Sequence, residues 1–225
     1  MSHSQDSRRV TPENFSYIGA ALCFALTAMM VAVRGYPSSL NVVLTFFAVI
    51  LVAPGWTLLW RSRRALRAWR HWTLGLCLGL APFVTWILAR RHLDVLPVFL
   101  SVALVFWVAG YDIVDACKDI SGDRKRGSFS LPARWGARRA LVISAGCHVA
   151  AVWLLALFGQ LADLGALYFF GLVLITPVLY WVHRTARPET LSRGRLAVMV
   201  GNSSSLLLLA ATALDFILVT GKMRI

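Results

Sequence analysis

The sequence has few charged residues, and acidic residues are the scarcest of them. Only 15% of its 225 residues are charged and only 10 are Asp or Glu, whereas 58% are hydrophobic. Soluble domains are about 25% charged and about 45–50% apolar, so this composition argues against a soluble globular protein. The four cysteines, Cys23, Cys77, Cys117 and Cys147, form no C-x-x-C pair, which argues against a disulfide framework and a zinc site.

Hydrophobic residues instead form long continuous blocks. Each block is about twenty residues long, the length at which a helix spans a bilayer, and the runs do not alternate as barrel strands do. We count seven blocks, at 15–34, 39–60, 72–90, 95–112, 138–159, 164–182 and 195–219. The sequence therefore predicts an all-α polytopic membrane helix bundle. We expect a cytoplasmic N-terminal segment over 1–14, a single transmembrane helical domain over 15–219 and a C-terminal tail over 220–225.

The basic residues indicate how the chain crosses the membrane. If the N-terminus is cytoplasmic, all but five of the 23 Lys and Arg fall in cytoplasmic segments, namely 1–14, 61–70, 111–139 and 183–195. This excess predicts a bacterial inner-membrane protein with its N-terminus inside and its C-terminus outside. The basic residues that give the net charge of +13 lie mostly between the predicted spans. We therefore expect this charge to face the lipid bilayer and not to bind nucleic acid.

Four of the ten acidic residues lie close together at the end of the fourth block. Asp112, Asp115, Asp119 and Asp123 are three or four residues apart, so they would share one face of a helix. Like charges at this spacing destabilise a helix by about 0.2–0.5 kcal/mol per pair, so a counter-charge is expected. Neighbouring Lys and Arg could supply it at a solvated helix end. A divalent metal could also supply it, and so could the cation of a transporter.

Carboxylates with no His or Cys near them in the sequence favour Mg²⁺ or Ca²⁺ over softer metals. Mg²⁺ is commonly held by one or two carboxylates together with substrate phosphates. The basic residues mixed with these aspartates would then bind the same anion from the other side. The run is therefore typical of a Mg²⁺–diphosphate site, although spacing alone leaves the ion-pair and transporter alternatives open.

The segment "GYDIVDACKDISGDRKRGSFSLPARWG", residues 110–136, resembles the second aspartate-rich motif of the UbiA-type intramembrane prenyltransferases. That motif runs D-x-x-Y-A-x-x-D-x-x-x-D, then a basic stretch, then G-x-x-S-x-P-A-R-x-G. The matching positions are Asp112, Ala116, Asp119, Asp123, Gly127, Ser130, Pro132, Ala133, Arg134 and Gly136. Segment 74–89 resembles an earlier span of the family. Segment 201–215 resembles the last span of its menaquinone and 4-hydroxybenzoate branch.

The resemblance implies a nine-helix bundle that joins a polyprenyl diphosphate to an aromatic acceptor in menaquinone or ubiquinone synthesis. It implies Mg²⁺ as the cofactor on the diphosphate. Asp112, Asp119 and Asp123 are then the expected catalytic and metal-binding residues. The expected substrate-binding residues are Lys118, Arg124, Arg134, Arg64, Asp115 and Asn202.

The chain departs from the family pattern in three respects. The first aspartate-rich motif, N-D-x-x-D-x-x-x-D, is absent, because Asp6 and Glu13 are the only acids before Asp94. With seven blocks in place of nine helices, the simplest expectation is that the first two helices are missing. Asp115 stands where the family usually has Tyr, and Gly122 stands where some branches have Asp. These departures leave a non-catalytic relative that binds isoprenoid lipid or a partner subunit as an alternative.

Some residues inside the predicted spans also have two interpretations. His148 is a lone polar residue in its block, and it could be functional or could form a hydrogen bond to another helix. Trp86 and Trp107 could line an isoprenoid tunnel. Asn202 could stabilise helix packing or face the cavity.

Overall fold

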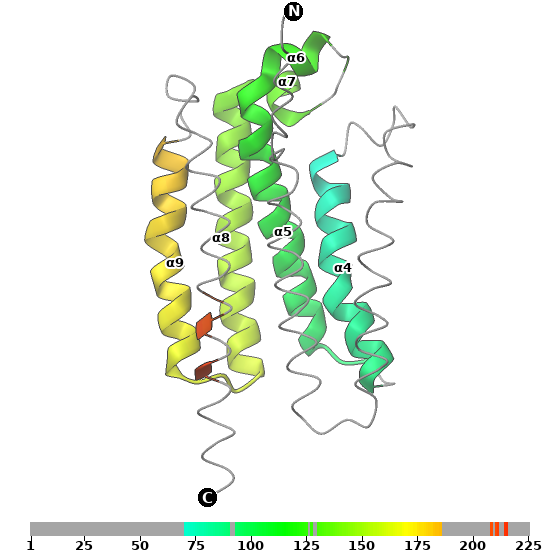
Figure 1. Cartoon of the computed structure of the whole chain (residues 1–225), viewed down its shortest axis with the longest axis vertical. Coiled ribbons are helices and arrows are strands. Elements are labelled where there is room, and N and C mark those ends of the chain that lie inside the picture. Colours follow the sequence, from blue (N-terminus) through cyan, green and yellow to red (C-terminus); the bar gives the residue numbers. More distant parts are fainter. Residues whose placement is uncertain are drawn as a thin grey trace, which may run out of the picture.

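A computed structural model describes residues 70–90, 93–125, 127, 130–185, 208, 210, 211, 214 and 215. In these residues every regular element is a helix, which confirms the predicted all-α class. Four long helices run side by side, namely α4 (Arg70–Arg90), α5 (Leu96–Ala116), α8 (Ala137–Leu161) and α9 (Ala166–Thr185) (Figure 1). Each coincides with one of the predicted apolar blocks to within a few residues.

Three helical stretches are long and apolar enough to cross a membrane. They are Leu96–Lys125, Ala137–Leu161 and Ala166–Thr185. Such lengths cover the roughly 30 Å hydrocarbon core of a bilayer. Blocks 15–34 and 39–60 lie outside the described residues, as does most of 195–219, so the count of seven spans stays a prediction.

The segment after residue 112, where the fourth apolar block ends, is largely helical. α5 extends past the predicted end of its block, and the 3₁₀ turn η1 (Cys117–Asp119) and the short helix α6 (Ile120–Lys125) follow directly. A positive φ of 61° at Gly127 marks a turn, and α7 (Leu131–Trp135) comes after it. The fourth apolar block ends at residue 112, before the end of α5, because the side chains become polar there. The backbone hydrogen bonds of a helix do not require apolar side chains, so the helix continues.

Helices α4 and α5 approach each other closely through two glycines one turn apart. A Cβ added at Gly75 would lie 2.5 Å from the carbonyl oxygen of Val105. A Cβ at Gly79 would lie 2.7 Å from the carbonyl oxygen of Ser101. Such small-x-x-x-small spacing lets helix backbones come together inside membranes, where dispersion contacts replace the hydrophobic effect. The pair Gly75 and Gly79 therefore fixes where α4 lies along α5.

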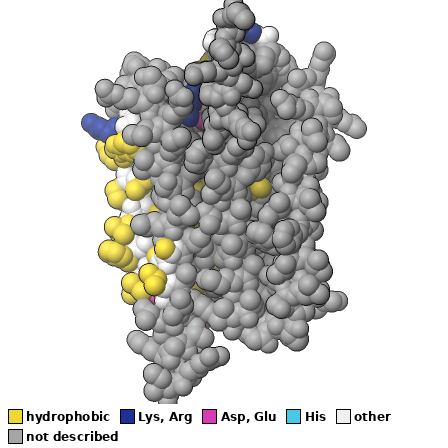
Figure 2. Space-filling model, in the orientation of Figure 1, with side chains coloured by type: hydrophobic (Ala, Val, Ile, Leu, Met, Phe, Trp, Pro, Cys, Tyr) yellow, Lys and Arg dark blue, Asp and Glu magenta, His cyan; other side chains and the backbone are white. Residues whose placement is uncertain are grey.

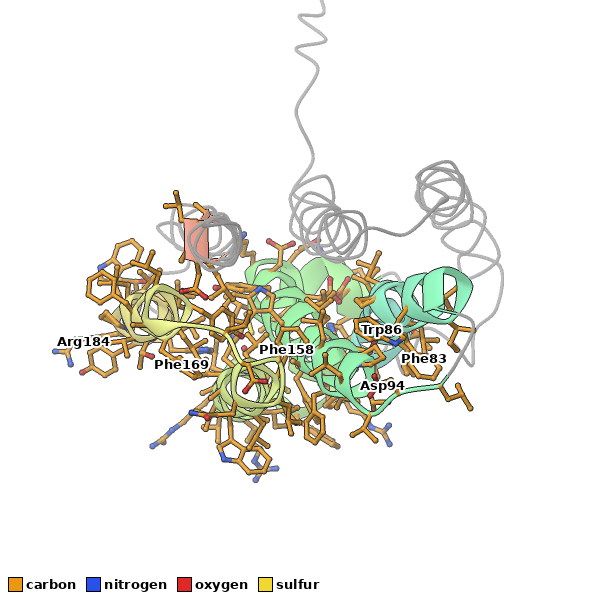
Figure 3. The ribbon with its side chains drawn as sticks, turned by 90° about the horizontal axis from the view of Figure 1, so that it is seen from below. Phe83, Trp86, Asp94, Phe158, Phe169 and Arg184 are labelled. Atoms are coloured by element: carbon orange, nitrogen blue, oxygen red, sulfur yellow. The ribbon has the colours of Figure 1, made fainter. Side chains whose placement is uncertain are left out.

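Helix α5 also packs against α8, and α8 forms a hairpin with α9. The Ser144 hydroxyl of α8 donates a buried hydrogen bond to the Gly110 carbonyl of α5, at 2.7 Å. The Tyr168 hydroxyl of α9 donates to the Leu155 carbonyl of α8, at 2.8 Å. Seen along the helices from below, Phe158 lies toward the middle of the bundle (Figure 3). These contacts place α5 between α4 and α8.

An acid from the last predicted span holds the beginning of α9. The buried carboxylate of Asp215 accepts hydrogen bonds from the Gly165 N–H at 2.5 Å and from the Leu167 N–H at 3.3 Å. The first N–H groups of a helix have no partner within the helix, so this carboxylate satisfies two of them. Residues near the end of the chain are therefore anchored to the α8–α9 turn.

The outer face of α9 is apolar, as a lipid-facing surface requires. Figure 2 shows hydrophobic side chains along the side of the molecule where α9 lies, with a basic side chain near its upper end. Exposed apolar residues of this helix include Leu167, Phe170, Val173, Leu174 and Tyr180. Arg184 points away from the bundle at the edge of α9 (Figure 3). The four aspartates singled out in the sequence lie elsewhere, along α5 and the segment that follows it.

Candidate functional site

The predicted acidic and basic residues that the structure describes gather at one end of the bundle, where η1, α6 and α7 continue beyond α5 (Figure 1). Apolar contacts hold this end together. Ile113, Cys117 and Ala140 are buried in one cluster, and the partly buried Leu131 and Leu141 pack against it. Because these residues come from α5, η1, α7 and α8, the polar segment rests on a packed apolar support.

The turn between α6 and α7 is fixed by hydrogen bonds. The buried Ser130 caps α7, because its Oγ accepts a hydrogen bond from the Ala133 N–H at 3.4 Å. The Arg124 Nε donates to the Ala133 carbonyl at 3.0 Å, which ties α6 to α7. The S-x-P-A-R part of the motif is therefore a capped helical turn that leaves the Arg134 side chain exposed.

Asp112 contacts a histidine from the beginning of α4. The Nδ1 atom of His71 lies 2.5 Å from Oδ2 of Asp112, and the side chains are 1% and 10% exposed. The other ring nitrogen of His71, Nε2, accepts a hydrogen bond from the Leu131 N–H at 3.3 Å. One buried imidazole thus joins the ends of α4 and α5 to the first residue of α7.

Asp115 and Asp119 have partners within their own segment. Asp115 forms an ion pair with Lys118, three residues later and on the same side of the helix. Asp119 is exposed, and its Oδ1 accepts a hydrogen bond from the Gly122 N–H at 3.0 Å. A Cβ at Gly122 would collide with this carboxylate, so the glycine allows the contact.

The four aspartates do not share one environment. Asp119 is exposed, Asp123 is 5% exposed, and Asp115 is 28% exposed beside Lys118. Within the described ranges, no three His, Cys, Asp or Glu side chains come together as a metal-binding group. Helical rise alone separates Asp112 from Asp123 by about 16 Å, so these carboxylates cannot all hold one ion directly. One or two of these carboxylates can still bind a metal ion if phosphate oxygens and water complete its coordination shell.

The expected substrate-binding residues are only partly brought together. Lys118, Arg124 and Arg134 lie at this end, and both arginines are exposed. Arg64 and Asn202 lie outside the described residues, so their placement stays a prediction.

A second polar cluster lies between α8 and α9, next to the acidic segment along α5. His148 Nδ1 of α8 and His183 Nε2 of α9 are 2.8 Å apart, which confirms that His148 forms a hydrogen bond to another helix. The His148 ring packs on Tyr111 and Trp107, with ring centroids 4.4 and 5.7 Å away. Trp107 belongs to the buried core around this ring, and Trp86 is also buried.

Sequence reasoning missed His71 and assigned His183 to a loop. His71 stands one residue before an apolar block, directly after a basic segment. A titratable residue at the edge of a membrane span is a candidate functional group, and this signal could have identified His71. His183 was missed because α9 extends to Thr185, beyond the predicted end of its block.

Comparisons with known proteins agree with this architecture. A family model described as the UbiA prenyltransferase family matches residues 6–214 of the chain. The solved apo structure of a UbiA homologue from Aeropyrum pernix K1 is 25% identical and has a TM-score of 0.59. That match covers 84% of this chain and 68% of the other. No match is found among the curated proteins. Because the family model covers nearly the whole sequence, the chain belongs to the UbiA prenyltransferase family.

Proposed function

We propose that this protein transfers a polyprenyl group from its diphosphate to an aromatic quinone precursor, with Mg²⁺ as the cofactor. The family assignment supports prenyl transfer as the class of reaction. One observation carries the proposal further. The segment from Asp112 to Arg134 holds acidic and basic side chains on a packed support at the end of the bundle. Such a mixture suits an anion that carries its own metal.

The carboxylates fit Mg²⁺ if the metal binds together with the substrate. Asp112, Asp119 and Asp123 are the proposed ligand residues, and oxygen is the donor that Mg²⁺ prefers. Their separation along the segment suits a diphosphate group between them better than a dedicated protein cage. When bound, the metal would stabilise negative charge on the departing diphosphate.

The basic residues would bind and orient the diphosphate. Lys118 and the exposed Arg124 and Arg134 lie on the same segment as the carboxylates. Guanidinium groups bind phosphate oxygens through paired hydrogen bonds, which fixes the orientation of the group as well as its charge. Arg64 and Asn202 complete the proposed set.

The ion pair between Asp115 and Lys118 bears on whether this chain is active. An aspartate in place of the family's tyrosine would repel a diphosphate if its charge were uncompensated. In the structure, Lys118 compensates that charge. This pairing supports the enzymatic alternative over a substrate-repelling site.

A non-catalytic relative that binds isoprenoid lipid is the second candidate. Asp115 in place of the family's usual tyrosine, and Gly122 where some branches have an aspartate, favour it. This candidate predicts binding of the diphosphate without transfer. In both cases we propose a bacterial inner-membrane protein with a cytoplasmic N-terminus, close to the menaquinone and 4-hydroxybenzoate branch.

Asp119→Ala tests the metal site. We expect this change to abolish Mg²⁺-dependent binding of farnesyl diphosphate, measured by calorimetry on the protein in nanodiscs, because it removes an exposed carboxylate. Asp163→Asn is the control, since Asp163 is an exposed acid in the turn between α8 and α9, at the other end of α8, and Asn tolerates its φ of 51°. Unchanged binding in Asp119→Ala would refute the metal assignment. Turnover with an aromatic acceptor then separates the enzyme from the non-catalytic relative.

A further inference from the structure

Both ring nitrogens of His71 have hydrogen-bond partners at this end of the bundle. It is 1% exposed and lies in the first turn of α4. Its two ring nitrogens contact Asp112 of α5 and the backbone of Leu131 in α7, which are 41 and 60 residues away in sequence. A ring held at both nitrogens has its orientation fixed by three helices at once.

The Leu131 contact determines which nitrogen carries the proton. Nε2 accepts the Leu131 N–H, so it holds a lone pair, and the neutral ring then carries its proton on Nδ1. Nδ1 therefore donates to the Asp112 carboxylate, whose Oδ2 lies 2.5 Å away. The backbone of α7 thereby sets the tautomer that Asp112 requires.

Asp112 is a proposed ligand, and its carboxylate must be held in one orientation to act with the metal and the diphosphate. Carboxylates that bind metals are themselves held by hydrogen bonds, and loss of such an outer partner commonly lowers metal affinity by about 10- to 100-fold. The hydrogen bond from His71 joins Asp112 to a different helix.

We propose that His71 is a positioning residue that orients Asp112 for the metal–diphosphate complex, with the Leu131 N–H of α7 selecting the tautomer that donates to Asp112. The proposal rests on the proposed function. It adds a residue from α4, outside the aspartate-rich motif, to the site. It also assigns a role to the S-L-P-A-R-W turn, because the Leu131 N–H that selects the tautomer belongs to that turn.

Two substitutions separate the two contacts of the ring. In His71→Asn, the amide N–H₂ takes the place of Nδ1 and can still donate to Asp112, while the contact to Leu131 is lost. In His71→Gln, the longer side chain places its amide oxygen where Nε2 accepts from Leu131, while the donor to Asp112 is lost. The readouts are Mg²⁺-dependent binding of farnesyl diphosphate by calorimetry and the Mg²⁺ concentration at half-saturation, with melting temperature in detergent as the check on folding.

We expect His71→Asn to bind close to the wild-type level. We expect His71→Gln to need about 10- to 100-fold more Mg²⁺ for half-saturation. Equal binding in both variants overturns the proposal, and so does a loss in His71→Asn alone, because Leu131 would then be the contact that matters. Failure of the wild-type protein to bind is a different result, since it refutes the proposed function itself.

Two further measurements decide the matter if His71→Gln does not fold. Nitrogen-15 NMR of histidine-labelled, metal-free protein should show the Nδ1–H tautomer for His71, and the Nε2–H tautomer overturns the proposal. His71→Ala removes the donor to Asp112 and should weaken binding of farnesyl diphosphate when Asp112 is present, but not in the Asp112→Asn background, because the carboxylate to be oriented is gone there. An equal loss from His71→Ala in both backgrounds would show that the histidine acts elsewhere and would overturn the proposal.

Discussion

The contact between α4 and α5 and the contact between α8 and α9 are built in different ways. The first brings two backbones together over Gly75 and Gly79, and its polar pair, His71 with Asp112, lies at the end of the helices. The second places aromatic rings of α9 against Gly159, and its polar pair joins His148, near the middle of α8, to His183 in the last turn of α9. The hydrogen bonds of His71 join three elements, whereas the hydrogen bond of the second pair joins two helices and the His148 ring only packs against α5. A contact that positions a charged group thus differs from one that holds helices together.

The buried nitrogens of the two histidines show the same difference. Both rings are 1% exposed. His71 has a partner at each nitrogen, whereas His148 Nε2 has no hydrogen-bond partner among the described residues and lies against Gly110. A Cβ at Gly110 would lie 2.8 Å from that nitrogen. His148 is therefore fixed mainly by packing, and His71 by its hydrogen bonds.

The largest expected effect comes from breaking the backbone approach of α4 and α5. Gly79→Leu would force a side chain into the Ser101 carbonyl and the Val105 side chain. Overpacking costs about 1–3 kcal/mol and more where backbone must move, so we expect the upper part of this range or failure to assemble. The measurement is the free energy of unfolding in detergent titration. Gly146→Leu is the matched control, because a Cβ at this exposed glycine meets nothing within 4 Å.

A smaller effect is expected from the corresponding change between α8 and α9. A Cβ at Gly159 would collide with the Tyr168 ring, which is a side chain and can shift where a backbone cannot. We expect Gly159→Ala to cost about 1–2 kcal/mol, less than Gly79→Ala, and to weaken the hydrogen bond from Tyr168 to Leu155. Unfolding of both alanine variants, with Tyr168→Phe as reference, checks this order. An equal cost at the two glycines would contradict the difference between the two contacts.

The smallest effect is expected from the intramembrane histidine pair. Interhelical hydrogen bonds in membranes contribute on average about 0.6 kcal/mol. A double-mutant cycle of His148→Leu and His183→Leu should return a coupling free energy of that size. Binding of farnesyl diphosphate should change little in either variant, in contrast to His71→Gln. A large loss of binding in His148→Leu would show that the pair belongs to the functional site.

Much of the fold could be predicted from the sequence, because the signals are local. The apolar blocks gave four described helices and the class of protein, since the length of an apolar run reports directly on what can span a bilayer. The helix end at residue 112 was wrong, because polarity reports where the chain leaves the hydrocarbon and not where the helix ends. The UbiA motif was read correctly as a sign of the family, to which the chain belongs.

The candidate site could be predicted only in part. The carboxylates and cations of the segment 112–134 were found because they are close in sequence. The contact from His71 was not, because no rule of spacing connects residues 41 positions apart. The partner of Asp115, in contrast, lies only three residues away, so Lys118 could be anticipated among the neighbouring cations.

The sequence by itself determined that the chain is helical, lies in a membrane and carries an acidic and basic segment beside one span. These properties depend on hydrophobicity and on short-range spacing, and both can be read from the order of the residues alone. Only the tertiary structure decided that Asp112 pairs with His71, that α7 fixes that imidazole, and that the four aspartates occupy different environments. The physical reason is that partners on different helices are chosen by packing, here by the close approach at Gly75 and Gly79, which sets the level at which α4 meets α5.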